Sequence, residues 1–155
     1  MKTILVPLDL SPAAVQVCDA ACELAQLIGA RPILLHIVQP PPVMMSEVYA
    51  FDASQLTEMN TAAGKSAVHK LRALARHCAK NQVQVITVQR TGVPVAAILA
   101  KAVSTKARYI VMGSHGHGAM YDLLVGSTTH GVLKKAPCPV LIVPPTTRRT
   151  RPAIR

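Results

Sequence analysis

The sequence predicts an α/β domain: a single open five-stranded parallel sheet with helices on both faces. Short apolar runs alternate five times with segments of helical periodicity, which is the order of a parallel sheet with crossover helices. Half of the residues are hydrophobic, yet only four are aromatic and none is tryptophan, so the core must be aliphatic. A chain of 155 residues corresponds to one domain and can bury about 70% of its unfolded surface.

The first predicted strand is the apolar run over residues 4–8, which ends at Asp9. Ser11 is a good helix N-cap and Pro12 suits the first helical position, so a helix is expected to begin there. Apolar residues then recur at intervals of three and four as far as Gly29, where this helix is expected to end. Residues 32–38 form the second apolar run and the second predicted strand.

The chain changes character over residues 39–54. Three consecutive prolines at positions 40–42 neither continue a strand nor start a helix cleanly. Methionine and aromatic side chains follow among polar residues, as in a flap over a binding site. A plain surface crossing explains the same residues and is the simpler interpretation.

The second half of the chain repeats the alternation. The remaining predicted elements are, in order, a helix over about 54–81, a strand over 83–89, a helix opened by Gly92-Val93-Pro94, a strand over 109–112, a helix that reaches Ala136, and the strand Val140–Val143. In an open parallel sheet, ligands bind beyond the carboxyl ends of the strands, where the strand order reverses. The loops at Asp9 and at Gly113 occupy that position in the sequence.

Charge is distributed unevenly along the chain. Residues 1–64 carry two basic and six acidic residues, whereas residues 65–155 carry fifteen basic residues and one acidic residue, and the formal net charge is +10. A basic half raises the question of nucleic-acid binding. The cations concentrate in one helical stretch and in the last eight residues, and aromatic side chains for stacking single-stranded bases are few. Solvated helix faces and a cationic tail are therefore the favoured interpretation.

Membrane and export signals are weak in this sequence. No apolar run reaches the roughly 20 residues that cross a bilayer, and the amino-terminal run is too short for a signal-peptide core. We therefore expect a cytoplasmic protein with no membrane partner. Four cysteines fit this compartment, and although Cys18 and Cys22 lie one helical turn apart, no second pair completes a metal site.

The glycine-rich segment after the fourth strand carries the clearest functional signal. Gly113 and Gly116 are followed, after nine further residues, by Gly126-Ser127-Thr128, which gives the spacing G-x-x-G-x9-G-[ST]. The first two glycines let backbone amides approach a ligand with no Cβ in the way. The second group stands where a helix begins, so free amides, the helix dipole and two hydroxyls indicate an anion site. A glycine-rich turn before an ordinary Ser/Thr helix cap would give the same pattern.

With this signature, the chain resembles the universal stress proteins, and specifically their ATP-binding branch. The likeness covers nearly the whole chain, from residues 4–11 through 34–38 to 136–144, and the signature that separates nucleotide binders of that family from non-binders is complete. The resemblance implies a Rossmann-like sheet of strand order 3-2-1-4-5. It also implies a nucleotide-binding domain over residues 1–145. The flap over residues 39–54 and the basic tail over 146–155, which we expect to be flexible, have no counterpart in the family pattern.

The resemblance further implies a site for ATP, or for ADP or AMP, with Mg²⁺ or Mn²⁺ held mostly by phosphate and water oxygens. Residues near the adenosine would supply an apolar wall and one acceptor, residues near the ribose would flank the sugar, and the remainder would hold phosphates. In that order, the implied nucleotide-binding residues are Pro7, Asp9, Ile37, Met112, Gly113, Gly116, Gly126, Ser127 and Thr128. None of them is assigned a catalytic role or a role as metal ligand.

Three histidines need separate interpretation. His115 and His117 could ligate a metal or approach the phosphates, although solvent-facing loop residues are the simpler description. His36 lies within a buried run and is interpreted as a core histidine whose hydrogen bonds are satisfied.

The favoured function is a nucleotide-dependent regulatory module of the stress response, which binds ATP and an unknown protein partner. The alternative is a slow ATPase or phosphotransferase, for which the sequence offers no convincing base, Walker lysine or arginine finger. Nucleic-acid binding through the basic half is the third and least favoured function. If the strand order is as implied, Val140–Val143 is an apolar edge strand, and we expect it to pair with a second copy in a homodimer.

Overall fold

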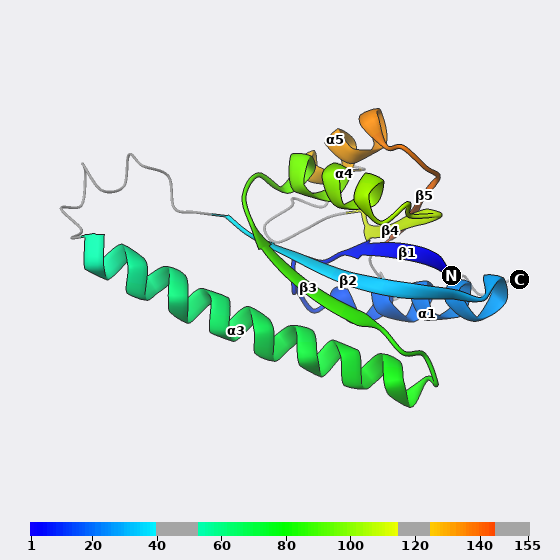
Figure 1. The fold of residues 1–155 in the computed structure, drawn as a ribbon, viewed down its shortest axis with the longest axis horizontal. Coiled ribbons are helices and arrows are strands. Elements are labelled where there is room, and N and C mark those ends of the chain that lie inside the picture. Colours follow the sequence, from blue (N-terminus) through cyan, green and yellow to red (C-terminus); the bar gives the residue numbers. More distant parts are fainter. Residues whose placement is uncertain (40–52, 115–124, 145–155) are drawn as a thin grey trace, which may run out of the picture.

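The computed structural model describes residues 1–39, 53–114 and 125–144, and the side chains of residues 53–60 and 63 lie outside that description. Its centre is one sheet with the strand order β3-β2-β1-β4-β5, in which every neighbouring pair is parallel (Figure 1). The strands are β1 (Lys2–Pro7), β2 (Ala30–Val38), β3 (Ile86–Thr91), β4 (Tyr109–Gly113) and β5 (Val140–Val143). The predicted fold class and strand order are both confirmed.

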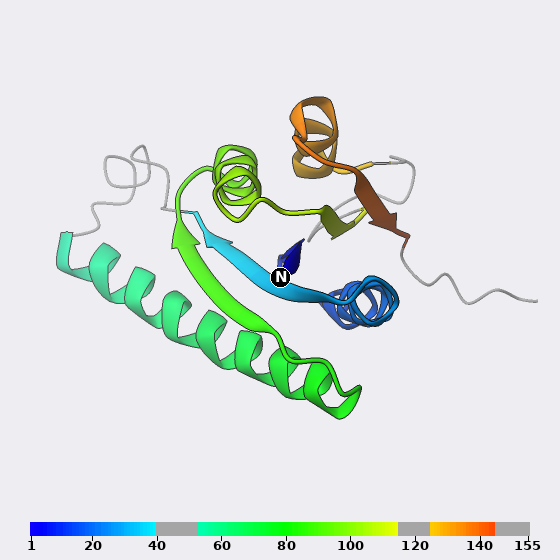
Figure 2. The ribbon, with the colours of Figure 1, turned by 45° about the vertical axis from the view of Figure 1, so that its right-hand side comes forward.

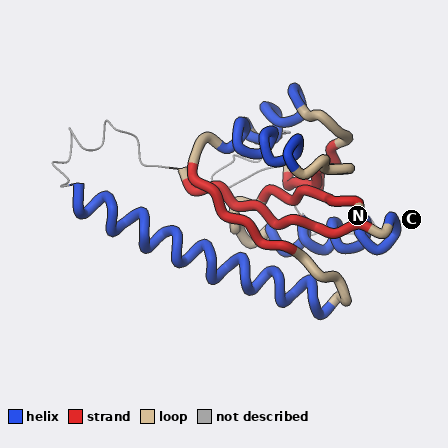
Figure 3. Tube along the Cα trace, in the orientation of Figure 1, coloured by secondary structure: helices blue, strands red, loops and turns tan. Residues whose placement is uncertain are grey.

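Helices cover both faces of the sheet (Figures 2 and 3). One face carries α1 (Ala14–Ile28) and the long α3 (Ala53–Lys80), and the other carries α4 (Pro94–Ser104) and α5 (Ser127–Lys135). The two-residue period of the strands divides the core between these faces. Ile4 and Val6 pack on the side of α1 and α3, whereas Leu5 between them packs on the side of α4 and α5, and all three are fully buried.

Two predicted boundaries were wrong for local reasons. Ser11 does not cap α1, because the helix begins only at Ala14 and the Ser11 carbonyl accepts from the Ala14 amide at 3.0 Å in a turn that precedes the helix. The third strand begins at Ile86 rather than at residue 83, where the apolar alternation starts. The Val83 amide still donates to the Cys78 carbonyl of α3 at 3.1 Å, so Val83 belongs to the turn that ends the helix. The predicted end of α1 at Gly29 is confirmed, since Gly29 adopts the left-handed conformation at φ 63°.

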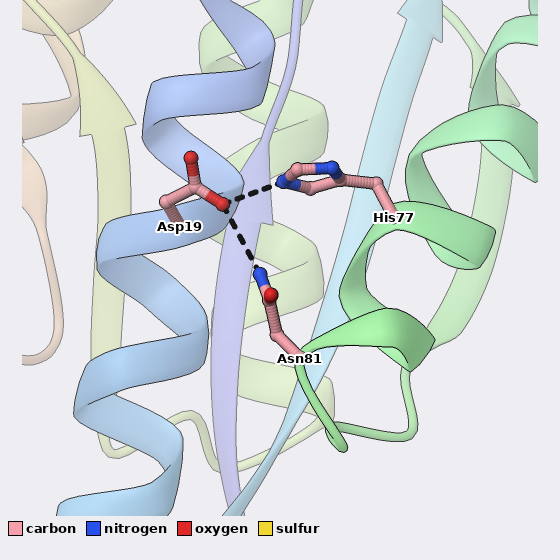
Figure 4. Close-up of polar contacts among 3 residues, drawn as sticks. All are labelled: Asp19, His77 and Asn81. Carbon is pink, nitrogen blue, oxygen red and sulfur yellow. Dashed lines mark hydrogen bonds and ion pairs between the residues drawn. The ribbon is translucent and has the colours of Figure 1, made fainter.

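The contact between α1 and α3 combines buried thiols with a polar surface cluster. Cys18 and Cys22 on α1 meet Cys78 on α3 in the core, and all three are free thiols. At the surface, Asp19 Oδ1 lies 2.6 Å from His77 Nε2 and accepts a hydrogen bond from Asn81 Nδ2 at 3.3 Å (Figure 4). Because both members of the His77–Asp19 pair are exposed, this pair contributes little to stability.

We expect only one of the four thiols to react readily. Burial is the main cause that raises the pKa of Cys22 to about 12, and a hydrogen bond to Cys18 together with burial raises the pKa of Cys78, so both remain protonated at neutral pH. Burial raises the pKa of Cys138 as well, but its side chain is half-buried whereas the other three are buried, so it is the thiol that a reagent can reach. A chromogenic disulfide reagent at pH 8 should therefore modify one thiol quickly and the others only as the protein opens. The Cys138→Ser variant should lack the fast phase, and a fast phase that persists in it would contradict this assignment.

Helices α4 and α5 approach closely at Gly131. A Cβ added there would lie 2.8 Å from Val95 Cγ2, which is too close for a stiff β-branched neighbour to accommodate. We expect Gly131→Ala to lower the free energy of unfolding by about 1 kcal/mol, because overpacking outweighs the higher helix propensity of alanine. Urea denaturation measures this change. In a Val95→Ala background the same substitution should be neutral or stabilising, and a stabilised single variant would show that the helices are not in contact here.

No helix among the described residues is both long enough and apolar enough to cross a membrane.

Candidate functional site

A cavity of about 980 Å³ opens at the carboxyl ends of β1, β2 and β4. This volume is in the range of pockets that hold small-molecule ligands. The cavity lies where the strand order reverses, because β1 continues through α1 to β2 on one side and pairs with β4 on the other. The amino-terminal ends of α1, α4 and α5 complete its walls, as Ala14, Pro94 and Ser127 show. The switch point therefore holds a preformed space, as expected for an open parallel sheet.

The first wall is the loop that leaves β1. Pro7 ends the strand, and the amide of Leu8 extends the ladder by one further bond to the Leu35 carbonyl, at 2.8 Å. Asp9 follows as an exposed side chain that lines the cavity, and one of its carboxylate oxygens accepts from the amide of Ser11. Leu10 then adopts φ 59°, a left-handed conformation that is uncommon for leucine. The position of the Asp9 carboxylate is thus tied to a tightly turned backbone.

The opposite wall is built by the end of β4 and the start of α5. The hydroxyl of the buried Thr129 donates to the Gly113 carbonyl at 2.9 Å, and the amide of Gly126 donates to the Ser114 carbonyl at 2.7 Å. The His130 amide makes the first bond back along the helix, to the Gly126 carbonyl. The amides of residues 127–129 precede that bond, so they have no partner within the helix. With the hydroxyls of Ser127 and Thr128, they form a positively polarised end that meets the cavity.

The described lining of the cavity combines an apolar wall with a few polar groups. Leu35, Ile37, Ile98 and Met112 supply apolar surface, and Asp9 is the one carboxylate among the described lining residues. The same set contains no lysine or arginine. In the described part of the chain there is also no group of three or more His, Cys, Asp or Glu side chains that could hold a metal ion. The cavity suits a ligand with a flat apolar part and an anionic part.

The structure brings most of the sequence-predicted site residues together at this cavity. It is lined by Pro7, Asp9, Ile37, Met112, Gly113, Gly126, Ser127 and Thr128. Gly116, together with His115 and His117, falls in residues 115–124, which lie outside the described residues, as do residues 40–52 of the predicted flap and the tail after residue 144.

Two histidines at the cavity were missed or misinterpreted from the sequence. His130 lies one helical turn after Gly126 and Ser127 and lines the same wall, a position that helical periodicity alone could have indicated. His36 was interpreted as a core histidine, but it is half-buried and lines the cavity. Its expected hydrogen bond is present, because Nδ1 lies 2.8 Å from the Leu8 carbonyl oxygen.

A parallel sheet with helices on both faces and a cavity at the point of strand reversal is a doubly wound α/β domain. Comparison with known proteins makes the assignment more specific. Residues 1–144 match the Universal stress protein family, and the chain belongs to that family.

Relatives support this assignment along nearly the whole chain. The universal stress protein in the QAH/OAS sulfhydrylase 3' region of Thermus aquaticus is 34% identical over 92% of this chain and 98% of its own length. The solved structure of the universal stress protein UspA from Lactobacillus plantarum has a TM-score of 0.78 at 27% identity, covering 92% of this chain and 97% of that one. The fold alone is shared with the Archaeoglobus fulgidus universal stress protein in complex with dAMP, which has a TM-score of 0.65 at 21% identity and covers 92% of this chain and 97% of that one.

Proposed function

We propose that this chain is a regulatory module that binds ATP at the switch-point cavity and signals its occupancy to a protein partner during stress. The observation that carries the proposal is the junction, in one cavity, of an apolar wall with the amino-terminal end of α5, whose first amides have no partner within the helix. An adenosine fits the first surface and a phosphate chain fits the second. Because lysine and arginine are missing from the described lining, amides and hydroxyls would carry the phosphate contacts.

The proposed pose assigns each wall to one part of the nucleotide. Adenine would lie against Ile37 and Pro7, with the Asp9 carboxylate accepting from an amino or ribose hydroxyl group. Met112 and Gly113 would flank the ribose, which leads toward the start of α5.

Gly126, Ser127 and Thr128 would hold the phosphates, with Gly116 contributing from the adjoining loop as the sequence signature implies. Mg²⁺ or Mn²⁺ would be held by phosphate and water oxygens, because the described lining offers hydroxyls but no carboxylate at this end. The Archaeoglobus fulgidus relative binds dAMP, so this fold can hold an adenine nucleotide. At 21% identity that likeness concerns the fold alone, and the pose rests on the cavity.

The test begins with the ligand that the protein carries. Small molecules released from the purified protein by heat or acid are identified by mass, and calorimetric titrations then compare ATP, ADP, AMP and GTP in the presence of Mg²⁺. We expect an adenine nucleotide to be released and ATP to bind more tightly than GTP. If nothing is released and no nucleotide binds the emptied protein, the proposed function is wrong.

Hydrolysis is the competing outcome of the same test. Asp9 is the one carboxylate in the described lining and lies at the β1 side of the cavity, whereas Ser127 and Thr128 lie at the α5 side. His130 on the α5 wall is the described lining side chain that could act as a base there, but the described lining supplies no lysine or arginine to stabilise the charge of the transition state. Labelled ATP with Mg²⁺ should consequently remain intact over many binding lifetimes. Turnover that a single change in the cavity abolishes would favour the slow ATPase or phosphotransferase instead.

We further propose that the protein is a homodimer joined through β5. This strand lies at the edge of the sheet and is flanked by Pro139 and Pro144. Val140 and Ile142 pack into the core with α4 and α5, whereas Leu141 is 42% exposed. An open apolar edge is an aggregation hazard, and antiparallel pairing of two copies about a two-fold axis would cover both edges at once.

A further inference from the structure

We propose that His36 is a positioning residue: its ring holds the loop between β1 and α1 in the conformation that presents Asp9 to the nucleotide. The proposal rests on the proposed nucleotide site and adds a residue to it that neither the glycine signature nor the implied binding set includes. It is carried by the hydrogen bonds of Leu8, the conformation of the loop, and the face of β2 from which His36 projects.

The hydrogen bond of His36 fixes one carbonyl group at the point where the chain leaves the sheet. Nδ1 lies 2.8 Å from the Leu8 carbonyl oxygen. A carbonyl oxygen only accepts, so Nδ1 carries the proton and donates. The Leu8 amide donates to the Leu35 carbonyl, also at 2.8 Å. Both polar backbone groups of Leu8 are therefore bonded to consecutive residues of β2, one of them through the imidazole.

The residues just after Leu8 adopt a backbone conformation that the hydrogen bonds of Leu8 would hold in place. Asp9 follows directly, and Leu10 adopts φ 59°, which costs a non-glycine residue about 1 kcal/mol or more. Such a conformation persists only where the surroundings determine it. The Ser11 amide donates to Asp9 Oδ1 at 3.1 Å, so the turn and the carboxylate move together. Releasing Leu8 would therefore release the acceptor that faces the cavity.

Strand geometry explains why this histidine can reach the loop. Leu35 and Ile37 pack on the α4 and α5 side of the sheet, so the alternation of β2 directs His36 toward the α1 side. Leu8 packs on the α1 side as well. A histidine one position earlier or later would face the opposite layer. The residue is half-buried, which shields its bond from water without enclosing it.

The binding experiment uses the full chain, four variants at His36 and Asp9, and one control variant. We expect His36→Leu to weaken ATP binding about tenfold, the equivalent of one hydrogen bond, because the donor is removed. His36→Asn places an amide donor near the position of Nδ1 and should stay within about threefold of wild type. The double variant His36→Leu/Asp9→Ala should bind no more weakly than Asp9→Ala alone, since His36 acts through Asp9.

Additive losses in that cycle would overturn the proposal, because they would mean that His36 acts independently of Asp9. Failure of His36→Asn to restore binding would overturn it as well, because a direct contact from Nε2 would then explain the loss. Circular dichroism shows at which temperatures each variant is folded, and all titrations are run within that range. His69→Leu, an exposed substitution on α3, is the matched control and should bind ATP as wild type does.

A second measurement needs no nucleotide and separates this proposal from the proposed function. NMR of the nucleotide-free protein measures the rate at which the Ser11 amide exchanges its hydrogen with water. This rate should rise in His36→Leu but not in His36→Asn or His69→Leu. If wild type binds no nucleotide while Ser11 exchange responds as expected, the proposed function fails and the role of His36 in holding the loop stands. If ATP binds but His36→Leu changes neither affinity nor exchange, the positioning role fails alone.

Discussion

Gly126→Asp is expected to weaken ATP binding by a factor of about a hundred or more while leaving the protein folded. Gly126 precedes α5 with φ −68° and ψ 158°, a backbone conformation open to any residue, so the substitution introduces no backbone strain. Its side chain would enter the space proposed for phosphate and place a negative charge beside the amides of residues 127–129, where the negative charge of the phosphates is proposed to lie. Isothermal titration with ATP and Mg²⁺ measures the loss, and thermal unfolding checks the fold.

Three further variants separate the effect of position from the effect of charge. Gly113→Val should also abolish binding, because a branched side chain would fill the space beside the ribose. Ser127→Ala should be milder, with the loss of one hydroxyl hydrogen bond of about 1 to 3 kcal/mol to a charged partner. Leu27→Asp adds the same charge at a residue of α1 that is 78% exposed and lies outside the cavity lining, and it should bind normally. Wild-type affinity in folded Gly126→Asp protein would refute the site.

Leu141→Lys is expected to convert the proposed dimer into monomers. Leu141 lies in the middle of edge strand β5, and two-fold pairing would bring its charge close to the same charge on the second copy. The structure decides which residue of β5 to change, because Ile142 packs into the core and its substitution would damage the fold. Light scattering across a dilution series should show a dimer for wild type and a monomer for Leu141→Lys.

The opposite edge of the sheet provides the matched control. Ile86 begins β3 and is 39% exposed, almost as much as Leu141, so Ile86→Lys should leave the assembly unchanged. If both variants dissociate, the general increase in charge is responsible rather than the pairing of β5. A wild-type chain that stays monomeric at high micromolar concentration, with and without ATP, would show that the edge is not used for pairing.

The sequence predicted the fold well because its signals are local and repeated. Each strand is a short apolar run and each helix has a clear stripe, so alternation alone indicated the parallel sheet, and the family resemblance supplied the strand order. Boundaries failed where backbone hydrogen bonds form turns between the predicted start and the observed one. The Ala14 amide bonds to the Ser11 carbonyl before α1, and the Val83 amide bonds to the Cys78 carbonyl before β3.

The site was predictable as far as the glycine motif and the family resemblance extend. The spacing of glycines and hydroxyls indicated the end of the site that would hold an anion, the resemblance supplied Pro7, Asp9, Ile37 and Met112, and eight of the implied residues line one cavity. His36 and His130 carry no such spacing, because their relation to the cavity depends on which face of β2 and which turn of α5 they occupy. Such relations follow from the three-dimensional arrangement of elements rather than from neighbours in the chain.

The division of the core by the sheet has a mechanical consequence. The sheet separates the layer under α1 from the layer under α4 and α5, because neighbouring side chains of β1 point into different layers. The cavity is the place where Ala14 and Val17 from one layer and Ile98 and Ser127 from the other surround a common space. A ligand bound in this cavity would contact both layers. At a ligand concentration of a hundred times the dissociation constant, binding would raise the free energy of unfolding by about 2.7 kcal/mol. Because the ligand would contact both layers, unfolding of either one would have to break its contacts.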